Sequence, residues 1–380
     1  MKLWSVAFSY RLGLGFHALN NEGADGSNLM QPRRIDVGEV TYDGISGEII
    51  RHHILENFIG LCRRDHIPML PVSEALHPDR GPIGIRLLAK RGGCDKLTKA
   101  NPSDLYKAVR EAIKQCAVLD VGGYLAAFAG REEAAEENQG EDQQQGAPKQ
   151  QTATKVTAVA PESTIMTDLA ELGGRTDGGA PYSVKRDSVF DAAWLVSESP
   201  QDSTVTQHSA YRPSGKQSLF SQTMRSNVYG GVIRADLHRV GADDYWYLQS
   251  KADRLALAQD QPLKRQQALI EAIVNFIASP TGAKVAAWAP HVFLTEGAIL
   301  LTSSRTAPFV SPIRVDVRDK NAPVAPNASY TAEMEKLKND TDTWVWIFKS
   351  ANELLRAGKS VSETLNGKAG KSDSEKGNEN

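Results

Sequence analysis

The stretch from Val205 to Arg239 contains the residue types that bind single-stranded nucleic acid. It has five basic residues against one acidic residue, and three aromatic residues lie among them. The basic residues are Arg212, Lys216, Arg225, Arg234 and Arg239, the acidic residue is Asp236, and the aromatic residues are Tyr211, Phe220 and Tyr229. Cations neutralise phosphates, and aromatic rings stack on unpaired bases. The stretch is therefore a candidate platform for a single strand, with a solvated basic hairpin as the alternative.

A second candidate phosphate site lies at the start of a helix that we predict to follow Ser46. The first N–H groups of a helix have no partner within it and attract anions, and nearby cations strengthen that attraction. Arg33 and Arg34 precede this helix start, and Arg51 lies about one turn into the helix. The region 31–64 also contains several carboxylates, so charge alone does not decide between a phosphate site and an ordinary solvated helix end.

Two glycines near the N-terminus formally match a dinucleotide-binding motif, because Gly13-x-Gly15-x-x-Ala18 has the G-x-G-x-x-A spacing. That motif requires a helix directly afterwards to receive the pyrophosphate. Here an Asn-Asn-Glu-Gly loop follows, and the chain contains no G-x-x-x-x-G-K-[ST] loop. We therefore expect glycine bends in a strand, or another backbone close to them, and we predict no cofactor.

The histidines and cysteines do not indicate a metal site. His52 and His53 are adjacent, so on a helix they point about 100° apart and do not easily share an ion. We expect a structural or RNA-facing role for His52, and a core position for His291 in its apolar surroundings. Three widely spaced cysteines, an odd number, favour neither zinc binding nor a disulfide framework. The cysteines are Cys62, Cys94 and Cys116, and they fit a reducing cytoplasm.

Composition limits the class of protein. A chain of 380 residues is long enough for about two domains, or for one core with large insertions. The net charge of −2 argues against a uniformly basic surface, but six acidic and three basic residues lie within 131–155, so the rest of the chain carries +1. We predict disorder for 131–155 and for the polar tail 366–380. We find neither a signal peptide nor an apolar run that could span a membrane, so we expect a soluble cytoplasmic protein.

Apolar periodicity predicts the elements that position these residues. Strict alternation from Trp4 to Phe16 predicts a long strand with one buried face. Helical spacing predicts helices after the caps Ser46 and Ser103, and a third after Pro262. We expect strands at 118–128 (with a Gly-Gly bend), 155–160, 225–237, 284–294 and 296–302. The order of strands and helices predicts an α+β fold with the split βαβ arrangement of ferredoxin-like and RNA-recognition-motif proteins, interrupted by long insertions.

Five sequence motifs in this order resemble a known family. They are FHALNNEGADGSNLMQPRRIDVG, GISGEIIRHHILENF, CAVLDVGGYL, RSNVYGGVIRADLHRVG and GAKVAAWAPHVFLTEGAIL. Together they look like the DevR-type CRISPR-associated proteins of the Cas-seven superfamily, which are backbone subunits of Cascade. The resemblance covers most of 1–130 and 180–305.

The resemblance implies a hand-shaped subunit with an RNA-recognition-motif-like palm, helical fingers and a thumb hairpin. It places the first palm strand and loop in 1–45, the fingers in 46–115 and palm in 116–130. The segment 131–155 is an insertion outside the family pattern, and 156–190 belongs to palm or insertion. The thumb hairpin falls in 191–227, palm and C-terminal elements in 228–365, and the tail in 366–380.

The resemblance also implies a set of RNA-binding residues. On the loop before the first helix these are Asn28, Gln31, Arg33 and Arg34, and on the helix itself Ser46, Arg51 and His52. On the thumb they are Tyr211, Arg212, Lys216, Gln217 and Phe220, with Arg225 and Asn227 at its base.

The function implied is that of a non-catalytic scaffold. Copies polymerise along a CRISPR guide RNA, together with other Cascade subunits, and the guide pairs with target DNA. Two alternatives remain open. A ribonuclease subunit of an RNA-targeting complex would use Asp25, with Asp36 as the second nominee, and an autoregulatory protein would bind duplex DNA.

Overall fold

The structure is a computed structural model that describes residues 3–19, 21–23, 29–93, 102–128, 182–200, 203–211, 217–245, 254–258, 260–280 and 291–367. The segment 131–155, the strand expected at 155–160 and the tail beyond 367 lie outside the described residues. The chain forms two compact units. The first comprises Met1–Leu61, Phe190–His238 and Gln266–Asn380, and the second comprises Cys62–Val189 and Arg239–Arg265. The finer division into palm, fingers and thumb stays a prediction.

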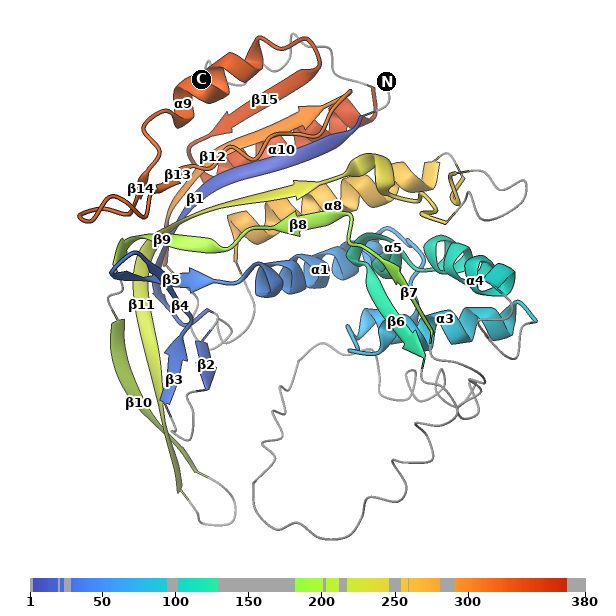
Figure 1. Ribbon diagram of the computed structural model, residues 1–380, viewed down its shortest axis with the longest axis horizontal. Helices are drawn as coiled ribbons and strands as arrows, with labels where there is room; N and C mark the ends of the chain where they lie inside the picture. Colours follow the sequence, from blue (N-terminus) through green and yellow to red (C-terminus); the bar gives the residue numbers. More distant parts are fainter. Residues whose placement is uncertain are drawn as a thin grey trace. The chain divides into compact units, whose positions relative to one another are not determined.

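The first unit is built around the long N-terminal strand that the alternating pattern predicts, β1 (Ser5–His17). It pairs antiparallel with β11 (Gln217–Ala235) on one side and with β12 (His291–Thr302) on the other. The sheet continues to β15 (Thr343–Phe348) beyond β12, and to β9 (Leu195–Pro200), β5 (Val40–Ile45) and β4 (Arg34–Val37) beyond β11 (Figure 1). Shorter strands join β11: β8 (Phe190–Ala192), β10 (Ser203–Tyr211) and β3 (Leu29–Pro32), which also pairs with β2 (Asn21–Gly23). The α+β class is therefore confirmed.

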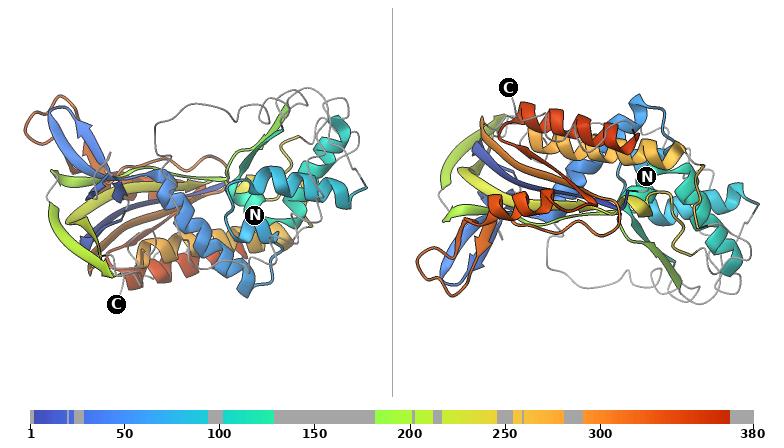
Figure 2. Two further views of the ribbon diagram at one scale, coloured as in Figure 1. Left: turned by 90° about the horizontal axis from the view of Figure 1, so that it is seen from below. Right: turned by 90° about the horizontal axis from the view of Figure 1, so that it is seen from above.

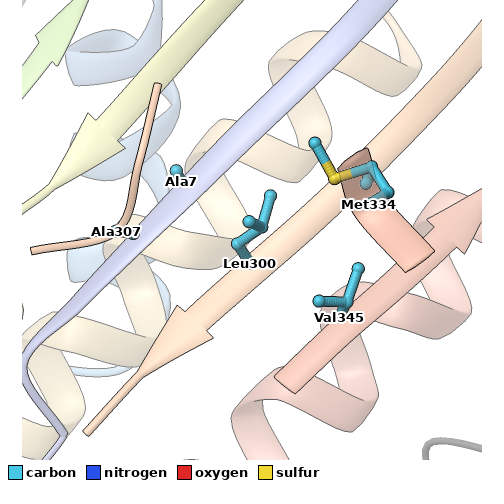
Figure 3. Packing of buried hydrophobic residues seen from close by; sticks show 6 residues of the cluster. Ala7, Leu300, Ala307, Met334 and Val345 are labelled. Carbon is cyan, nitrogen blue, oxygen red and sulfur yellow. The ribbon is translucent and has the colours of Figure 1, made fainter. Parts of the chain in front are cut away.

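Both faces of β1 are covered, so the expectation of one buried face was wrong. Phe8 and Tyr10 are fully buried on the predicted face, but Ala7 and Ser9 on the opposite face are fully buried too. Ala7 packs in a second core cluster with Ala298, Leu300, Ala307, Met334 and Val345, which is shown in Figure 3. Met334 belongs to α9 (Tyr330–Lys338). The small side chains on this face of β1 thus make room for a covering helix and do not mark a solvent-exposed surface.

Helices cover the other face of the sheet. Figure 2 shows α8 (Asp260–Ala278) and α10 (Ala351–Leu365) side by side on one face of the sheet and α9 on the opposite face. The two helices approach closely at Gly358, where an added Cβ would lie 2.7 Å from a methyl carbon of Val274. A short hairpin, β13 (Ile313–Val315) with β14 (Val324–Pro326), packs its apolar residues against β4 and β5. None of the helices in the described part of the chain is long and apolar enough to cross a lipid bilayer.

The first helix, α1 (Gly47–Arg64), begins where the sequence predicts. The backbone N–H of Ile49 donates to Ser46 Oγ at 3.4 Å, which confirms the expected N-cap. Ile50, Ile54 and Phe58 are fully buried and form the predicted apolar face.

The second unit contains four helices and one strand pair among its described residues. They are α2 (Pro71–Glu74), α3 (Arg80–Arg91), α4 (Pro102–Gln115), α5 (Ala117–Gly122), β6 (Tyr124–Phe128) and β7 (Tyr182–Arg186), and the two strands are antiparallel. The predicted strand at 118–128 was therefore wrong for its first half, which is α5. The helix expected after Ser103 is α4, which begins one residue earlier than that cap. The helix expected after Pro262 is α8 and begins at Asp260.

A buried carboxylate on α5 joins several segments of the second unit. Asp120 is fully buried and accepts hydrogen bonds from Arg186 Nη2 at 2.5 Å and from Arg265 Nη1 at 2.7 Å. The backbone N–H of Gly241 donates to the same carboxylate at 3.0 Å. Both guanidinium groups are almost fully buried and donate in addition to backbone carbonyls, for example from Arg186 to Ala242 at 2.7 Å. Asp120 thus joins α5, β7, the loop at 239–245 and the start of α8.

Removal of this carboxylate should strongly destabilise the second unit. Asp120→Ala removes the counter-ion of the buried Arg265 guanidinium and leaves Arg186 with only the partly exposed Asp244, 3.1 Å away. Breaking a buried ion pair costs about 3–5 kcal/mol. Calorimetric unfolding of the full chain should show this loss. The matched control is Asp187→Ala, which removes an exposed aspartate next to Arg186 and should change stability by less than about 0.5 kcal/mol. Equal effects of the two substitutions would contradict the central role of Asp120.

Candidate nucleic-acid interface

The basic and aromatic stretch forms a long hairpin. Residues 203–211 of β10 pair with 217–225 of β11, from Ser203 opposite Arg225 to Tyr211 opposite Gln217. The hairpin extends beyond the other strands of the sheet (Figure 1). Tyr211, Gln217 and Phe220 lie on its paired strands. Arg212 and Lys216, at 212–216, lie outside the described residues.

The loop before the first helix runs along this hairpin. β3 pairs parallel with β11, with Leu29 opposite Ser221 and Met30 opposite Gln222. Gln31 follows on β3 and pairs with Glu22 of β2. The structure thus brings together two regions that the sequence treats as separate candidates, although 189 residues of chain lie between Gln31 and Ser221. Asn28 and Asp25 lie outside the described residues.

A buried polar network holds the base of the hairpin. Arg225 of β11 is 2% exposed, and its guanidinium donates to the backbone carbonyl of Leu19 and to Asp43 Oδ1, the latter at 3.5 Å. The hydroxyl of Tyr229 donates to Asp43 Oδ2 at 3.4 Å, and His17 Nε2 lies 2.9 Å from that hydroxyl. The network therefore links the end of β1 to β5 and β11.

Burial controls the charges in this network. It lowers the pKa of His17 to about 3, with a further contribution from the nearby Arg225 cation, so His17 is neutral at physiological pH. Burial also raises the pKa of Asp43, and the guanidinium of Arg225 opposes that rise. It raises the pKa of Tyr229 as well, so that hydroxyl keeps its proton and can donate.

Arg225 and Asn227 have internal partners. Asn227 is 8% exposed, and its side-chain amide donates to the carbonyl of Ser199 at 3.2 Å. The visible contribution of both residues is to hold the hairpin in place, and a direct contact with RNA stays a prediction for them. Sequence reasoning missed Asp43 and His17, because each is a single polar residue with no motif around it.

The start of α1 lies against a neighbouring strand. An added Cβ on Gly47 would lie 2.1 Å from the carbonyl oxygen of Ala192, so β8 packs directly on the first turn of the helix. Ser46 is buried. Arg51, half-buried, places its guanidinium carbon 5.7 Å from the centre of the Phe190 ring. The first turn of α1, where we predict a phosphate site, is thus partly covered by β8.

His52 and His53 converge on one carboxylate. Glu56 lies 3.4 Å from His52 Nε2 and 2.6 Å from His53 Nδ1, and these hydrogen bonds lower the pKa of Glu56 to about 2. Ligand atoms of the three residues lie within 4.8 Å of one another, the one such group among the described residues. Side-chain rotation thus compensates for the angle of about 100° between the two histidines. That they do not easily share a metal ion stays a prediction.

Arg33 and Arg34 lie at the edge of the sheet beside an exposed tryptophan. The guanidinium carbon of Arg33 lies 5.3 Å from the centre of the Trp194 ring, and Trp194 is 40% exposed. Arg34 is exposed on β4, opposite Asp43 of β5. Trp194 was not a candidate in the sequence, where a tryptophan next to Leu195 and Val196 indicates a core position. His291 is exposed as well, so the expectation of a core histidine was wrong.

A family model matches most of the chain. Residues 8–322 match the family described as "CRISPR-associated negative auto-regulator DevR/Csa2". Two solved structures are also similar. A chain of a "CRISPR RNA-guided surveillance complex, pre-nicking" is 12% identical with a TM-score of 0.45, and the alignment covers 96% of this chain and 100% of that one. A chain of a "CRISPR RNA-guided surveillance complex" is 9% identical with a TM-score of 0.40, covering 95% and 99%. These TM-scores are too low to establish a shared fold. No curated protein matches the chain.

The buried His17 should make stability fall in acid. Its pKa is about 3 in the folded state and 6.5 in an unfolded chain, so only the unfolded chain gains a proton between these values. The stability due to neutral His17 is therefore complete above pH 6.5 and is lost as the pH falls from 6.5 towards 3. At pH 4 the loss amounts to about 3 kcal/mol. Urea unfolding at pH 7 and pH 4 should show a smaller loss in His17→Gln than in the wild type.

The exposed His66 provides the control for this measurement. His66→Gln should show the same acid sensitivity as the wild type. An acid sensitivity that His17→Gln leaves unchanged would mean that His17 is not neutral in the folded chain.

Proposed function

The chain belongs to the CRISPR-associated DevR/Csa2 family, and from this premise we propose that it is a non-catalytic, RNA-binding backbone subunit of a type I, Cascade-like surveillance complex. In this proposal copies of the chain line up along a CRISPR guide RNA in the cytoplasm. Together with other Cascade subunits they hold the guide so that it can pair with target DNA. The protein contacts phosphate and ribose, and base pairing selects the target sequence.

The observation that carries this proposal is the hairpin of β10 and β11 with β3 alongside it. The hairpin residues 203–225 include Arg212, Lys216 and Arg225 and no acidic residue, a net charge of +3 with histidine neutral, although the whole chain carries −2. Because Arg225 pairs internally with Asp43, Arg212 and Lys216 are the cations that we propose for the guide. Phosphate neutralisation supplies most of the affinity of non-specific nucleic-acid binding, so a local basic strip is enough for a guide-binding subunit. The register of β3 on β11 brings the start of the loop, up to Gln31, beside the hairpin, while Arg34 lies further away on the edge strand β4.

We assign the palm to the centre of the first unit. The strand order β12-β1-β11-β9, with both neighbours of β1 antiparallel to it, supports an RNA-recognition-motif-like sheet. So does the chain order, because α1 follows β1 and α8 lies between β11 and β12. The hairpin is then the thumb, and the helices of the second unit are candidates for the fingers.

An autoregulatory role is the second candidate, since the family description includes negative auto-regulation. It would require binding of duplex DNA without guide RNA. An RNA-cleaving subunit using Asp25 is the enzymatic alternative. Asp36, the weaker nominee, is exposed on β4 and accepts a hydrogen bond from the hydroxyl of Thr41 at 2.7 Å.

Co-purification tests the proposal directly. The chain isolated from cells that express a CRISPR array should carry guide-sized RNA and should show a raised ratio of absorbance at 260 nm to that at 280 nm. RNA-free protein from such cells would contradict it, and binding of an operator duplex by RNA-free protein would favour auto-regulation.

Charge reversal tests the proposed contacts. Arg51→Glu combined with Lys216→Glu should weaken guide binding, and should reduce the slope of log affinity against log salt by about 1.4, because two phosphate contacts to a single strand are lost. Arg318→Glu is the matched control, since Arg318 is 88% exposed on the turn between β13 and β14. An unchanged salt slope in the double variant would rule out these two contacts.

Incubation with complementary RNA and a divalent metal distinguishes scaffold from nuclease. We expect the assembled complex to leave the RNA intact. Regularly spaced cuts that disappear in Asp25→Ala would establish the enzymatic alternative instead.

A further inference from the structure

An aromatic ring, that of Phe293, packs against the two glycines near the end of β1. An added Cβ on Gly13 would lie 2.5 Å from Phe293 Cε2, and one on Gly15 would lie 3.8 Å from Phe293 Cδ1. A side chain at Gly13 would therefore displace the ring. Phe293 is nevertheless 60% exposed, so the glycines support one side of the ring while the rest of it faces solvent. The spacing that formally matches a dinucleotide motif thus serves to seat an exposed phenyl ring.

A second exposed ring, Phe16, lies near the same end of β1 on a strained backbone. Phe16 is 61% exposed and has a φ of +53°, a left-handed conformation that is rare for a bulky residue and costs stability. Its backbone N–H donates to Ser226 Oγ at 2.9 Å. The ring of His291 meets it edge to face, with centres 6.0 Å apart. An exposed phenylalanine in this conformation gains no burial in return for the strain.

Both strand ladders of β1 are irregular at this point. The pairing with β11 shifts register between Leu14 and His17, and the pairing with β12 shifts between Gly13 and Leu14. Such bulges re-aim side chains and are common next to functional sites. Two such shifts lie within five residues of Phe16, and Gly15 lies close to both His291 and Phe293, so the three rings belong to one region of the surface.

The chemistry of this place favours a base over a phosphate. The cation of β1, Arg11, is held by the carboxylates of Glu198 and Glu296, so it is already neutralised. The exposed groups of this surface are aromatic rings. Ser226, which accepts the hydrogen bond of the Phe16 N–H, connects the surface to the base of the hairpin. Every unpaired nucleobase has a face that can stack on such rings. We propose that Phe16, His291 and Phe293 form a stacking site for an unpaired base of single-stranded RNA at the base of the β10–β11 hairpin.

This inference rests on the proposed function and adds a base-binding site to it. The test compares two fluorescently labelled 12-residue probes on the full chain, an oligouridine RNA and an oligomer of equal length and charge without bases. Phe293→Leu should weaken oligouridine binding about 10-fold, the effect of losing one base–aromatic stack, and should leave binding of the base-free probe unchanged. Phe293→Tyr, which keeps an aromatic ring, should restore it.

Two further variants separate stacking from folding. Phe16→Gly removes the ring and relieves the positive φ, so we expect weaker oligouridine binding with an unchanged or raised melting temperature. Phe309→Leu is the matched control, since Phe309 is another exposed phenylalanine of the first unit, 49% exposed, and packs against Arg234. It should bind both probes as the wild type does.

The outcomes distinguish this site from the function on which it rests. A wild-type chain that binds neither probe contradicts the proposed function itself. Two other results are a wild type that binds RNA together with a Phe293→Leu variant that either binds oligouridine equally well or binds both probes more weakly by the same factor. Either result overturns the stacking site and leaves the proposed scaffold function standing. A change of oligomeric mass in Phe293→Leu with unchanged RNA affinity would also overturn it, because the rings would then join copies of the chain.

Discussion

A guanidinium group almost without access to solvent lies where the hairpin leaves the sheet. A buried charge is tolerated only when it is paired and hydrogen-bonded. Arg225 therefore fixes the positions of the segments that contain its hydrogen-bond partners. Those partners are the Asp43 carboxylate on β5 and the Leu19 carbonyl just beyond β1. The position of the hairpin, the exit of β1 and the start of the loop that returns as β3 are therefore set together. A charged residue that the sequence predicts to bind RNA can thus be buried instead, where it fixes the positions of neighbouring strands.

The second unit also contains a buried ion-pair network, but its central group is a carboxylate. One buried carboxylate, Asp120, pairs with two guanidinium groups from distant parts of the chain, and Asp244 is a further partner of one of them, Arg186. Such a network contributes little net free energy when complete but is costly when incomplete, so it selects one arrangement of segments over others. This specificity matters in a unit whose described segments are short and separated in sequence.

The sequence patterns predicted local structure well and long-range contacts poorly. Alternation identified β1, and the Ser46 cap identified the start of α1, because both signals depend on neighbouring residues. The helical turn around Asp120 was missed because its apolar neighbours suit a buried strand as well as a buried helix. Phe293 lying over Gly13 depends on a pairing between β1 and β12 across most of the chain, and no local pattern encodes it. The burial of Arg225 was missed for the same reason, since composition reports charge without reporting its partner.

The pairing of β6 with β7 determines where the chain could accept an inserted segment. Phe128 and Tyr182 are opposite each other at the end of this ladder. The Cα atoms of such pairs lie only about 4.5–5.5 Å apart. The polypeptide between them therefore departs and returns at nearly one point, and its length has little effect on the closure entropy. A fluorescent domain or an affinity peptide inserted next to Phe128 would therefore add little closure entropy, which makes this point a natural attachment site for observing the protein inside a larger assembly.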